Sequence, residues 1–209
     1  MKLVKTQDGS YTAYNQTARE HYHTISGAIE EAFEKHVNAL GISDGMPILD
    51  FCFGLGYNAI AATKNHNNLE IIALENDPEI IKMMAEIEIP AILASEYNYF
   101  RNLAAQNVLT DPNHNRISLI LGDALKEIDQ LPDNYFQRVF FDPFSPKKQP
   151  QMWSAELLQK VYDKMQNGGK LSTYSCARIV RDNLKAAGFQ VLDGPVIGRR
   201  SPATIALKK

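Results

Sequence analysis

Four acidic residues stand at the ends of successive apolar segments of this sequence, namely Asp50, Glu75, Asp123 and Asp142. If the segments are parallel strands, their carboxyl ends meet at one edge of a sheet, where the ligands of such sheets bind. There Glu75 can accept hydrogen bonds from both hydroxyls of a ribose, and Asp123 can accept one from the amino group of an adenine. Asp123 and Asp77 can equally be helix N-caps. Four acids at four segment ends favour a ligand site over unrelated caps.

The turn that follows Asp50 carries two glycines between an apolar run and a helix start, with Phe53, Gly54 and Gly56 at its centre. Glycine permits positive φ and lets a ligand approach bare backbone. We expect this turn to contact an adenosine-containing cofactor. A Gly-x-Gly pattern is a weak signal by itself, and Ala59 stands where the dinucleotide signature has its third glycine.

The segment Asp142-Pro143-Phe144-Ser145-Pro146 follows another apolar run, and its two prolines make it stiff. The segment resembles the Asp/Asn-Pro-Pro-aromatic motif of methyltransferases that act on amino groups. An alkylammonium must lose a proton before it acts as a nucleophile, and the resemblance implies that Asp142 is the base. It also implies that Phe144 flanks the nucleophile or stacks on a base of the substrate. The alternative is that Asp142 caps a turn and Phe144 belongs to the core.

The elements that would position these residues alternate between strand and helix. The expected strands are 48–52, 69–75, 116–121, 138–141, 170–174, 189–192 and 203–207, and the expected helices are 58–64, one that opens at Asp77-Pro78, 95–109, 123–129, 154–165 and 177–187. Such alternation implies a parallel sheet with helices on both faces. The last two strands have no helix between them and should pair antiparallel. We therefore expect an α/β fold with a seven-stranded, mostly parallel sheet and one antiparallel strand at its edge.

Residues 1–45 are expected to form an N-terminal extension of the same domain, and residues 46–209 its core. The turn Asp8-Gly9-Ser10 suggests a small hairpin. Apolar and small residues at helical spacing predict a long helix from Thr17 to Leu40.

The composition is that of an ordinary globular domain, with 209 residues, 44% hydrophobic and 22% charged. No apolar run approaches the ~18–20 residues of a membrane span, and the N-terminus lacks the apolar stretch of a secretory signal. The two cysteines, Cys52 and Cys176, are far apart and do not predict a zinc site or a disulfide framework. We expect a cytoplasmic protein with no membrane segment and no metal.

The net charge of −2 hides an asymmetry. Residues 1–142 hold 10 Lys and Arg against 20 Asp and Glu, whereas residues 143–209 hold 12 against 4. A basic C-terminal third indicates an anionic partner, unless the excess is merely solvated surface.

Together, the glycine turn, the Gly122-Asp123-Ala124 turn and the turn after Asp142 resemble motifs of class I S-adenosylmethionine-dependent methyltransferases, which have a Rossmann-like fold. The resemblance implies S-adenosyl-L-methionine as cofactor, with S-adenosyl-L-homocysteine as its product. The implied cofactor contacts are Asp50, Phe53, Gly54, Gly56, Glu75, Asp77, Gly122, Asp123 and Asp142.

The longer segment from Asp142 to Trp153 resembles the Asp-x-Phe-x-Pro-x-Lys-Asn-Pro-x-x-Trp segment of one particular family. This is the methyltransferase component of the bifunctional enzymes of tRNA 5-methylaminomethyl-2-thiouridine biosynthesis. The resemblance covers most of the chain and includes Asp8-Gly9-Ser10, Tyr22-His23 and Thr173-Tyr174. Gln149 departs from it, because the family usually has Asn there.

The FAD-dependent oxidase domain that many members carry is absent from these 209 residues. The resemblance therefore implies a stand-alone methyltransferase without FAD. Its implied reaction is N-methylation of 5-aminomethyl(-2-thio)uridine at the tRNA wobble position, which gives 5-methylaminomethyl(-2-thio)uridine. A separate oxidase or another amine-forming enzyme would act upstream.

Binding to the anticodon region of a tRNA would use cations for phosphates and aromatic rings for a flipped base. The expected contacts are Lys147, Lys148, Trp153, Tyr174, Arg178, Arg181, Arg199 and Arg200. Trp153 can alternatively be a core residue at a helix start.

Two other functions remain open. The first is an aminopropyltransferase of the spermidine synthase type, which shares the fold and several of the motifs. Lys147 and Lys148 beside the expected site oppose a polycationic substrate. The second is a non-catalytic tRNA-binding module with a relic cofactor pocket, which the four intact strand-end acids disfavour.

Overall fold

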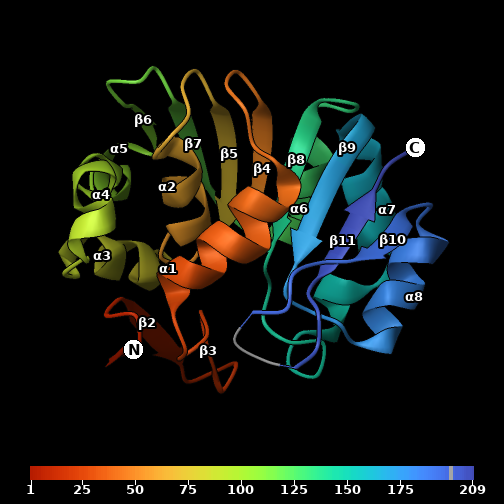
Figure 1. Ribbon diagram of the computed structural model, residues 1–209, viewed down its shortest axis with the longest axis horizontal. Helices are drawn as coiled ribbons and strands as arrows, with labels where there is room; N and C mark the ends of the chain where they lie inside the picture. The colour runs from red at the N-terminus through yellow and green to blue at the C-terminus, as the bar shows by residue number, and fades with distance from the viewer. Residues whose placement is uncertain (198–199) are drawn as a thin grey trace.

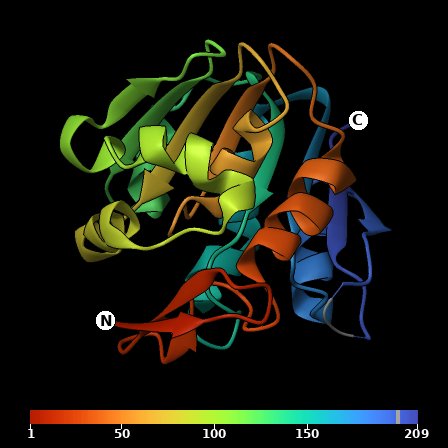
Figure 2. The ribbon, with the colours of Figure 1, turned by 60° about the vertical axis from the view of Figure 1, so that its left-hand side comes forward.

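An eight-stranded sheet with helices on both faces forms the body of the molecule (Figure 1). The computed structural model describes residues 1–197 and 200–209. The strands of the sheet follow the order β10-β11-β9-β8-β4-β5-β7-β6. A second sheet, with the order β1-β2-β3, lies below the carboxyl ends of the central strands (Figures 1 and 2).

The small sheet contains β1 (Lys2–Lys5), β2 (Tyr11–Asn15) and β3 (Glu20–His21). The large sheet contains β4 (Pro47–Phe51), β5 (Glu70–Glu75), β6 (Val108–Thr110), β7 (Arg116–Leu121), β8 (Phe136–Phe141), β9 (Met165–Thr173), β10 (Gln190–Asp193) and β11 (Thr204–Leu207). The α-helices are α1 (Ala28–Glu31), α2 (Tyr57–Thr63), α3 (Pro78–Glu86), α4 (Ala94–Phe100), α5 (Leu103–Gln106), α6 (Ala124–Glu127), α7 (Ala155–Lys164) and α8 (Arg178–Ala186). A π-helical segment, Ala32–Asn38, continues α1, and short 3₁₀ turns cover Ala91–Leu93, Ile128–Gln130 and Pro150–Trp153.

The central strands β9, β8, β4, β5 and β7 pair in parallel, which confirms the expected α/β fold class. The sheet nevertheless differs from the expectation in two ways. The reversed strand β11 lies between β9 and β10 and not at the edge. The additional strand β6 pairs antiparallel with β7 at the opposite edge.

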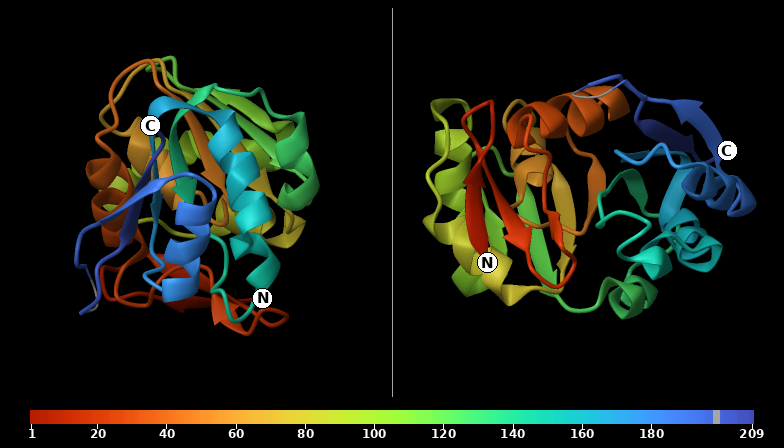
Figure 3. Two further views of the ribbon diagram at one scale, coloured as in Figure 1. Left: turned by 90° about the vertical axis from the view of Figure 1, so that its right-hand side faces the viewer. Right: turned by 90° about the horizontal axis from the view of Figure 1, so that it is seen from below.

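Helices cover both faces of the large sheet (Figure 3). Two apolar cores, one on each face, hold them in place. One core packs α2, α3 and α4 through side chains such as Tyr57, Tyr97 and Phe100. The other packs α7 and α8 through side chains such as Phe141 and Trp153. Buried on both faces, the central strands consist of nearly continuous apolar residues, as parallel strands do.

The helix expected from Thr17 to Leu40 begins only at Ala28. The segment before it forms β3 and a turn, where Arg19 has a φ of 55°, and Ile25, which fitted the helical spacing, is 46% exposed. The helix starts where it does because Asp8 Oδ2 accepts hydrogen bonds from the backbone N–H groups of residues 29 and 30, both at 3.1 Å. The Asp8 turn therefore ties the small sheet to the start of the helix.

The helix expected over 95–109 is also shorter than predicted. It is divided into α4 and α5, and Asn107 ends α5 with a φ of 58°. The next three residues form β6, in which Leu109 is buried between two exposed neighbours. Asn tolerates this left-handed conformation, so it can end the helix where a glycine would normally be expected.

Candidate active site

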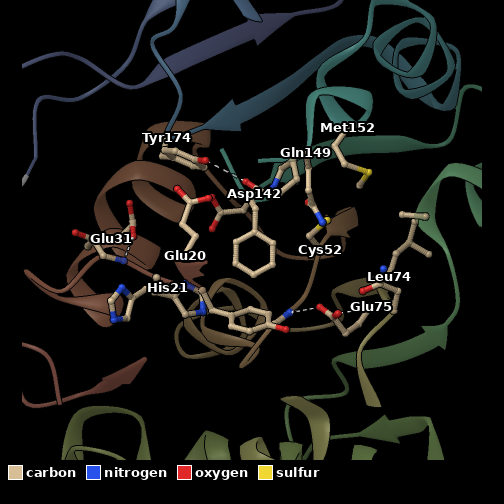
Figure 4. Close-up of a pocket in the computed structure, with 18 of the residues that line it drawn as sticks. Glu20, His21, Glu31, Cys52, Leu74, Glu75, Asp142, Gln149, Met152 and Tyr174 are labelled. Carbon is tan, nitrogen blue, oxygen red and sulfur yellow. Dashed lines mark hydrogen bonds between the residues drawn. The ribbon is translucent and has the colours of Figure 1, made fainter. Parts of the chain in front are cut away.

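A cavity of about 470 Å³ opens at the carboxyl ends of β4, β5, β7 and β8 (Figure 4). Its walls come from three places: the strand ends and the turns after them, the segment from Glu20 to Ile25, and the start of the first helix. The small N-terminal sheet therefore contributes directly to the site. This is the edge at which open α/β sheets bind ligands.

Glu75, at the end of β5, is held rigidly at one side of the cavity. Its Oε2 accepts the backbone N–H of Gly54 at 2.8 Å, and its Oε1 accepts the N–H groups of Asn76 and Asp77, both at 2.9 Å. The side chain is buried, and burial raises its pKa. A carboxylate offers about four lone-pair positions and three are occupied here, so one position on Oε2 remains for a ribose hydroxyl.

The glycine turn brings bare backbone to the cavity. Gly54 has a φ of 58°, and a Cβ on it would lie 3.2 Å from Tyr22 Cδ1. Gly56 has a φ of 80°, and a Cβ on it would lie 2.6 Å from the ring of Phe53. Gly54 lines the cavity, whereas Gly56 packs behind the turn.

Asp142, at the end of β8, has a much looser environment. Its Oδ2 lies 3.4 Å from Asn58 Nδ2 and 3.8 Å from His36 Nε2, and its side chain is 7% exposed. Burial, followed by the charge of Glu31, raises the pKa of Asp142 to about 7, although Asn58 and Lys35 oppose the rise. A carboxyl group with a pKa near neutrality in a cavity can accept a proton at physiological pH.

Two hydrogen bonds fix the backbone of the loop after Asp142. Trp153 Nε1 donates to Phe144 O at 2.8 Å, and Tyr174 Oη donates to Pro143 O at 3.1 Å. Trp153 is only 2% exposed and does not line the cavity, so the expected stacking of a substrate base on Trp153 is wrong. Its indole supports the loop from behind.

The N-terminal segment holds the front of the same loop. Glu20 Oε2 accepts the N–H of Ser145 at 2.8 Å, and the ring of Tyr22 lies edge-on to Phe144 with centroids 4.9 Å apart. The hydroxyl of Tyr22 donates to Asp77 Oδ2 at 3.0 Å. Phe144 therefore lines the cavity on a loop that is supported from both sides, and Tyr174, which follows β9, also lines the cavity.

Four of the expected cofactor residues line the cavity: Gly54, Glu75, Asp123 and Asp142. Of the others, Asp77 accepts the N–H of Glu79 as the N-cap of α3, and it lines a smaller adjacent hollow. Four expected contacts do not line the cavity, namely Asp50, Phe53, Gly56 and Gly122.

Asp50 is the clearest departure among the expected cofactor residues. Its side chain is completely buried inside β4, and neither carboxyl oxygen makes a well-formed hydrogen bond within residues 1–197 and 200–209. Burial, followed by the charge of Asp142, raises the pKa of Asp50 well above its ordinary value. Asp50 therefore lies behind the site and not in its lining.

The expected cationic residues are dispersed. Lys147 and Lys148 are exposed, and Lys148 lines the smaller hollow together with Phe144. Arg178 is 96% exposed on α8 and lies 3.5 Å from Asp182, and the less exposed Arg181 forms an ion pair with Asp193 at 2.6 Å. Arg200 is exposed. Arg199 lies outside the described residues.

Three polar residues of the helix that begins at Ala28 were not predicted from the sequence as parts of the site. Glu31 and Lys35 line the cavity, and the buried His36 contacts Ser172 Oγ through Nδ1 at 2.8 Å. Burial lowers the pKa of His36 to about 4, so its ring is neutral. The only sequence signal was the i,i+4 spacing of Glu31 and Lys35, which is equally typical of an exposed helix face.

Within the described part of the chain, no group of three or more His, Cys, Asp or Glu side chains could hold a metal ion. The helices of residues 1–197 and 200–209 include none that is long and apolar enough to cross a membrane.

A family model of S-adenosyl-L-methionine-dependent methyltransferases matches residues 89–209, which is more than half of the chain. The chain belongs to this family. Membership agrees with the positions of Glu75, Asp123 and the glycine turn at the carboxyl ends of the strands. The resemblance inferred from the sequence is therefore confirmed at this level.

Three relatives refine the comparison. An uncharacterized protein of Methanocaldococcus jannaschii is 34% identical and is aligned over 99% of this chain and 59% of its own length. The tRNA 5-methylaminomethyl-2-thiouridine biosynthesis bifunctional protein MnmC of Leptospira interrogans is 31% identical over 76% of this chain and 26% of its own length. The crystal structure of MNMC2 from Aquifex aeolicus has a TM-score of 0.83 and 27% identity, covering 100% of this chain and 70% of that chain.

The spermidine synthase of Thermotoga maritima is a more distant neighbour. It has a TM-score of 0.63 and 12% identity, and it covers 99% of this chain and 71% of that chain. At this level of identity the likeness shows the fold alone.

Proposed function

We propose that this protein transfers a methyl group from S-adenosyl-L-methionine to the primary amine of 5-aminomethyl(-2-thio)uridine at the wobble position of tRNA. The product is 5-methylaminomethyl(-2-thio)uridine. The observation that carries the proposal is Asp142, a buried carboxyl group with a pKa of about 7 beside Phe144 in the cavity. The names of the MnmC relatives supply the substrate class.

The residues of the cavity fit the cofactor of the family. Glu75 Oε2 keeps one lone-pair position for a ribose hydroxyl, and Asp123 faces the cavity from the next strand end. Gly54 removes the side chain that would otherwise lie against Tyr22. When bound, S-adenosyl-L-methionine supplies an electrophilic methyl group on a sulfonium.

Asp142 and the loop after it perform the remaining tasks. The carboxylate form of Asp142 accepts a proton from the substrate ammonium, which frees the nitrogen lone pair for attack. Phe144 and Tyr174 border the space beside it and can flank a planar base. Holding the two reactants in line contributes much of the rate acceleration of such a displacement.

The basic C-terminal third supports a tRNA partner. Lys147, Lys148, Arg178 and Arg200 are exposed, and the two lysines are on the loop that carries Phe144. Such contacts to phosphates add affinity that falls steeply with salt. Arg181 is a weaker candidate for this role, since Asp193 already neutralises it. The substrate amine would come from a separate enzyme.

One observation favours the aminopropyltransferase as the second candidate. The same cavity is lined by Glu20, Glu31 and Asp142, and acids suit a polyamine. Two features of the cavity oppose a polycation: Lys35, paired with Glu31, adds a positive charge, and Glu20 already accepts the N–H of Ser145.

The test is a product analysis. The protein is incubated with S-adenosyl-L-methionine carrying a labelled methyl group and with tRNA that contains 5-aminomethyluridine, and the nucleosides are separated by mass. We expect labelled 5-methylaminomethyluridine. No labelled nucleoside would overturn the tRNA assignment. A parallel incubation of putrescine with decarboxylated S-adenosylmethionine tests the second candidate, which requires spermidine as product.

A further inference from the structure

A buried ion pair in the cavity takes up no proton in the reaction just described, although its charges act on the pKa of Asp142. Lys35 Nζ lies 2.7 Å from Glu31 Oε1, and the two side chains are 5% and 8% exposed. Both residues line the cavity. Burying two charges is costly, and a pair of this kind is weak evidence for a purely stabilising role.

Lys35 is the one lysine or arginine among the described residues that line the cavity. The acids of the cavity suit the two cations of the proposed reaction, the sulfonium and the substrate ammonium. The positive charge of a buried lysine repels both cations, unless a bound anion neutralises that charge. An ammonium group has three donors, and Glu31 is the partner found for Lys35 among the described residues.

Two anions could reach such a cavity: the carboxylate of the cofactor and a phosphate of the tRNA. A backbone phosphate belongs to a large folded chain, and the Lys35 side chain, 5% exposed, lies too deep for one. The cofactor, by contrast, ends in an ammonium and a carboxylate on one carbon atom. Glu31 and Lys35 offer an acceptor and a donor side by side, with the complementary signs.

The position of the pair agrees with an extended cofactor. Glu75, the ribose acceptor, receives the N–H of Gly54 at 2.8 Å. A Cβ on Gly54 would lie 3.6 Å from His23 Nε2, and the next residue, Thr24, donates its N–H to Glu31 Oε2 at 3.1 Å. The glycine turn and the His23 segment therefore connect the ribose side of the cavity to the ion pair.

His23 supplies an independent observation on this path. The residue is 7% exposed and lines the cavity, yet its Nε2 has no hydrogen-bond partner in the described part of the chain. A buried polar atom without a partner is costly. His23 thus lines the cavity wall between Gly54 and the segment that contacts Glu31.

We propose that the Glu31–Lys35 pair is the subsite for the amino-acid end of S-adenosyl-L-methionine, with Glu31 on its α-ammonium and Lys35 on its α-carboxylate. The subsite separates this cofactor from decarboxylated S-adenosylmethionine, which lacks the carboxylate. This inference rests on the cofactor part of the proposed function and not on its tRNA part.

The test compares ligands that differ only at this end. S-adenosyl-L-homocysteine carries the amino-acid group, whereas 5′-methylthioadenosine keeps the adenosine and the sulfur and lacks it. Calorimetric titration without tRNA gives the affinity for each. In Glu31→Gln/Lys35→Met, we expect the affinity for S-adenosyl-L-homocysteine to fall roughly tenfold to a hundredfold, because hydrogen bonds between charged groups are lost. The affinity for 5′-methylthioadenosine should stay unchanged.

The double variant is preferred to Lys35→Met, because a lone buried carboxylate can unfold the protein whereas a neutral pair is usually tolerated. Lys64→Met is the matched control: it breaks an ion pair with Glu96, 3.2 Å long, in which neither residue lines the cavity. Wild-type affinity for S-adenosyl-L-homocysteine in the double variant would overturn the proposal, and so would an equal loss for both ligands.

A measurement on the wild-type protein needs no variant. S-adenosyl-L-methionine should bind at least about tenfold more tightly than its decarboxylated form, and equal affinities would contradict the subsite. If the pair instead contacts the uridine, the double variant raises KM for tRNA with unchanged cofactor affinity, and that result also rejects the proposal. Failure of the tRNA methylation assay leaves these binding results unaffected.

Discussion

Glu75 and Asp142 are carboxyl groups at the ends of two strands that flank β4, and they differ in how many hydrogen bonds they receive. Glu75 accepts three backbone N–H groups at 2.8–2.9 Å. Asp142 is approached by one side-chain donor, Asn58 Nδ2, at 3.4 Å. Burial raises the pKa of both, and the pKa of Asp142 rises to about 7.

This difference suits Glu75 to ligand binding and Asp142 to proton transfer. Backbone donors favour the charged form of Glu75 and fix its orientation, which suits an acceptor for neutral hydroxyls. Asp142 has little to stabilise its charge, so it can take up and release a proton at neutral pH. The two carboxyl groups lie at the same edge of the sheet. They differ in function because they receive different numbers of hydrogen bonds from N–H groups.

The largest effect is expected for Asp142→Asn. The amide keeps the shape of the side chain but cannot accept the proton, so kcat should fall by about 10²–10⁴-fold, the usual contribution of a general base. Affinity for S-adenosyl-L-homocysteine should change by less than about threefold, because Asp142 is not its main anchor. Single-turnover methylation and calorimetry measure the two quantities. Near-normal turnover would show that Asp142 is not the general base, and Asp142 and Glu75 would then not differ in role.

Glu75→Gln should show the opposite pattern. The new NH₂ group must face the N–H of Gly54 or those of Asn76 and Asp77, so one buried donor loses its acceptor. We expect the Kd for S-adenosyl-L-homocysteine to rise roughly tenfold to a hundredfold, with kcat at saturating cofactor nearly unchanged. Glu79→Gln, at an exposed acid on α3, is the control. A loss of kcat without a loss of affinity would mean that the two acids share one role.

The raised pKa of Asp142 also predicts how stability depends on pH. Between the ordinary value of 3.8 and about 7, the folded state binds more protons at this site than the unfolded state does. The free energy of unfolding therefore decreases as the pH rises through this window. Asp142→Asn removes the effect, so the variant should gain roughly 1–3 kcal/mol over wild type at pH 8 and little at pH 4. Urea titrations at both values measure this, and an equal gain at both would contradict the assigned pKa.

The sequence predicted the parts of the site that depend on local pattern. A strand end followed by a glycine turn requires positive φ, and Gly54 and Gly56 have it, at 58° and 80°. Glu75 and Asp142 follow strands whose apolar runs are unambiguous, so their place at the sheet edge follows from topology alone. The cavity receives both residues, as predicted.

What the sequence did not predict depends on which face of an element is buried. Glu31 and Lys35 occur at a spacing that is common on exposed helices, and only packing places them in the cavity. Trp153 was assigned to base stacking because of its type, but its neighbours bury it. Arg181 was assigned to tRNA, but β10 brings Asp193 to within 2.6 Å of it. These outcomes depend on contacts between residues that are distant in sequence or on opposite faces of one helix.

The smallest effect is expected for His36→Gln, which changes the weakly hydrogen-bonded environment of Asp142. His36 Nε2 lies 3.8 Å from Asp142 Oδ2 and is buried without a hydrogen-bond partner among the described residues. The ring is neutral because burial lowers its pKa to about 4, and a carboxylate beside Nε2 favours the tautomer with the proton there. That N–H dipole stabilises the charge of Asp142 slightly.

In the wild-type protein, kcat/KM should therefore rise with pH and level off above about 7, when Asp142 is ionised. In His36→Gln this rise should move upward by about half a pH unit, with kcat at pH 9 changed by less than about threefold. His66→Gln, at a histidine whose Nδ1 contacts Ala62 O at 2.7 Å outside the cavity, is the matched control. A downward shift would place the proton on Nδ1, toward Ser172, so that Nε2 presents a lone pair to Asp142 and favours the protonated acid. An unchanged profile would leave Asn58 as the one side chain that tunes Asp142 by direct contact.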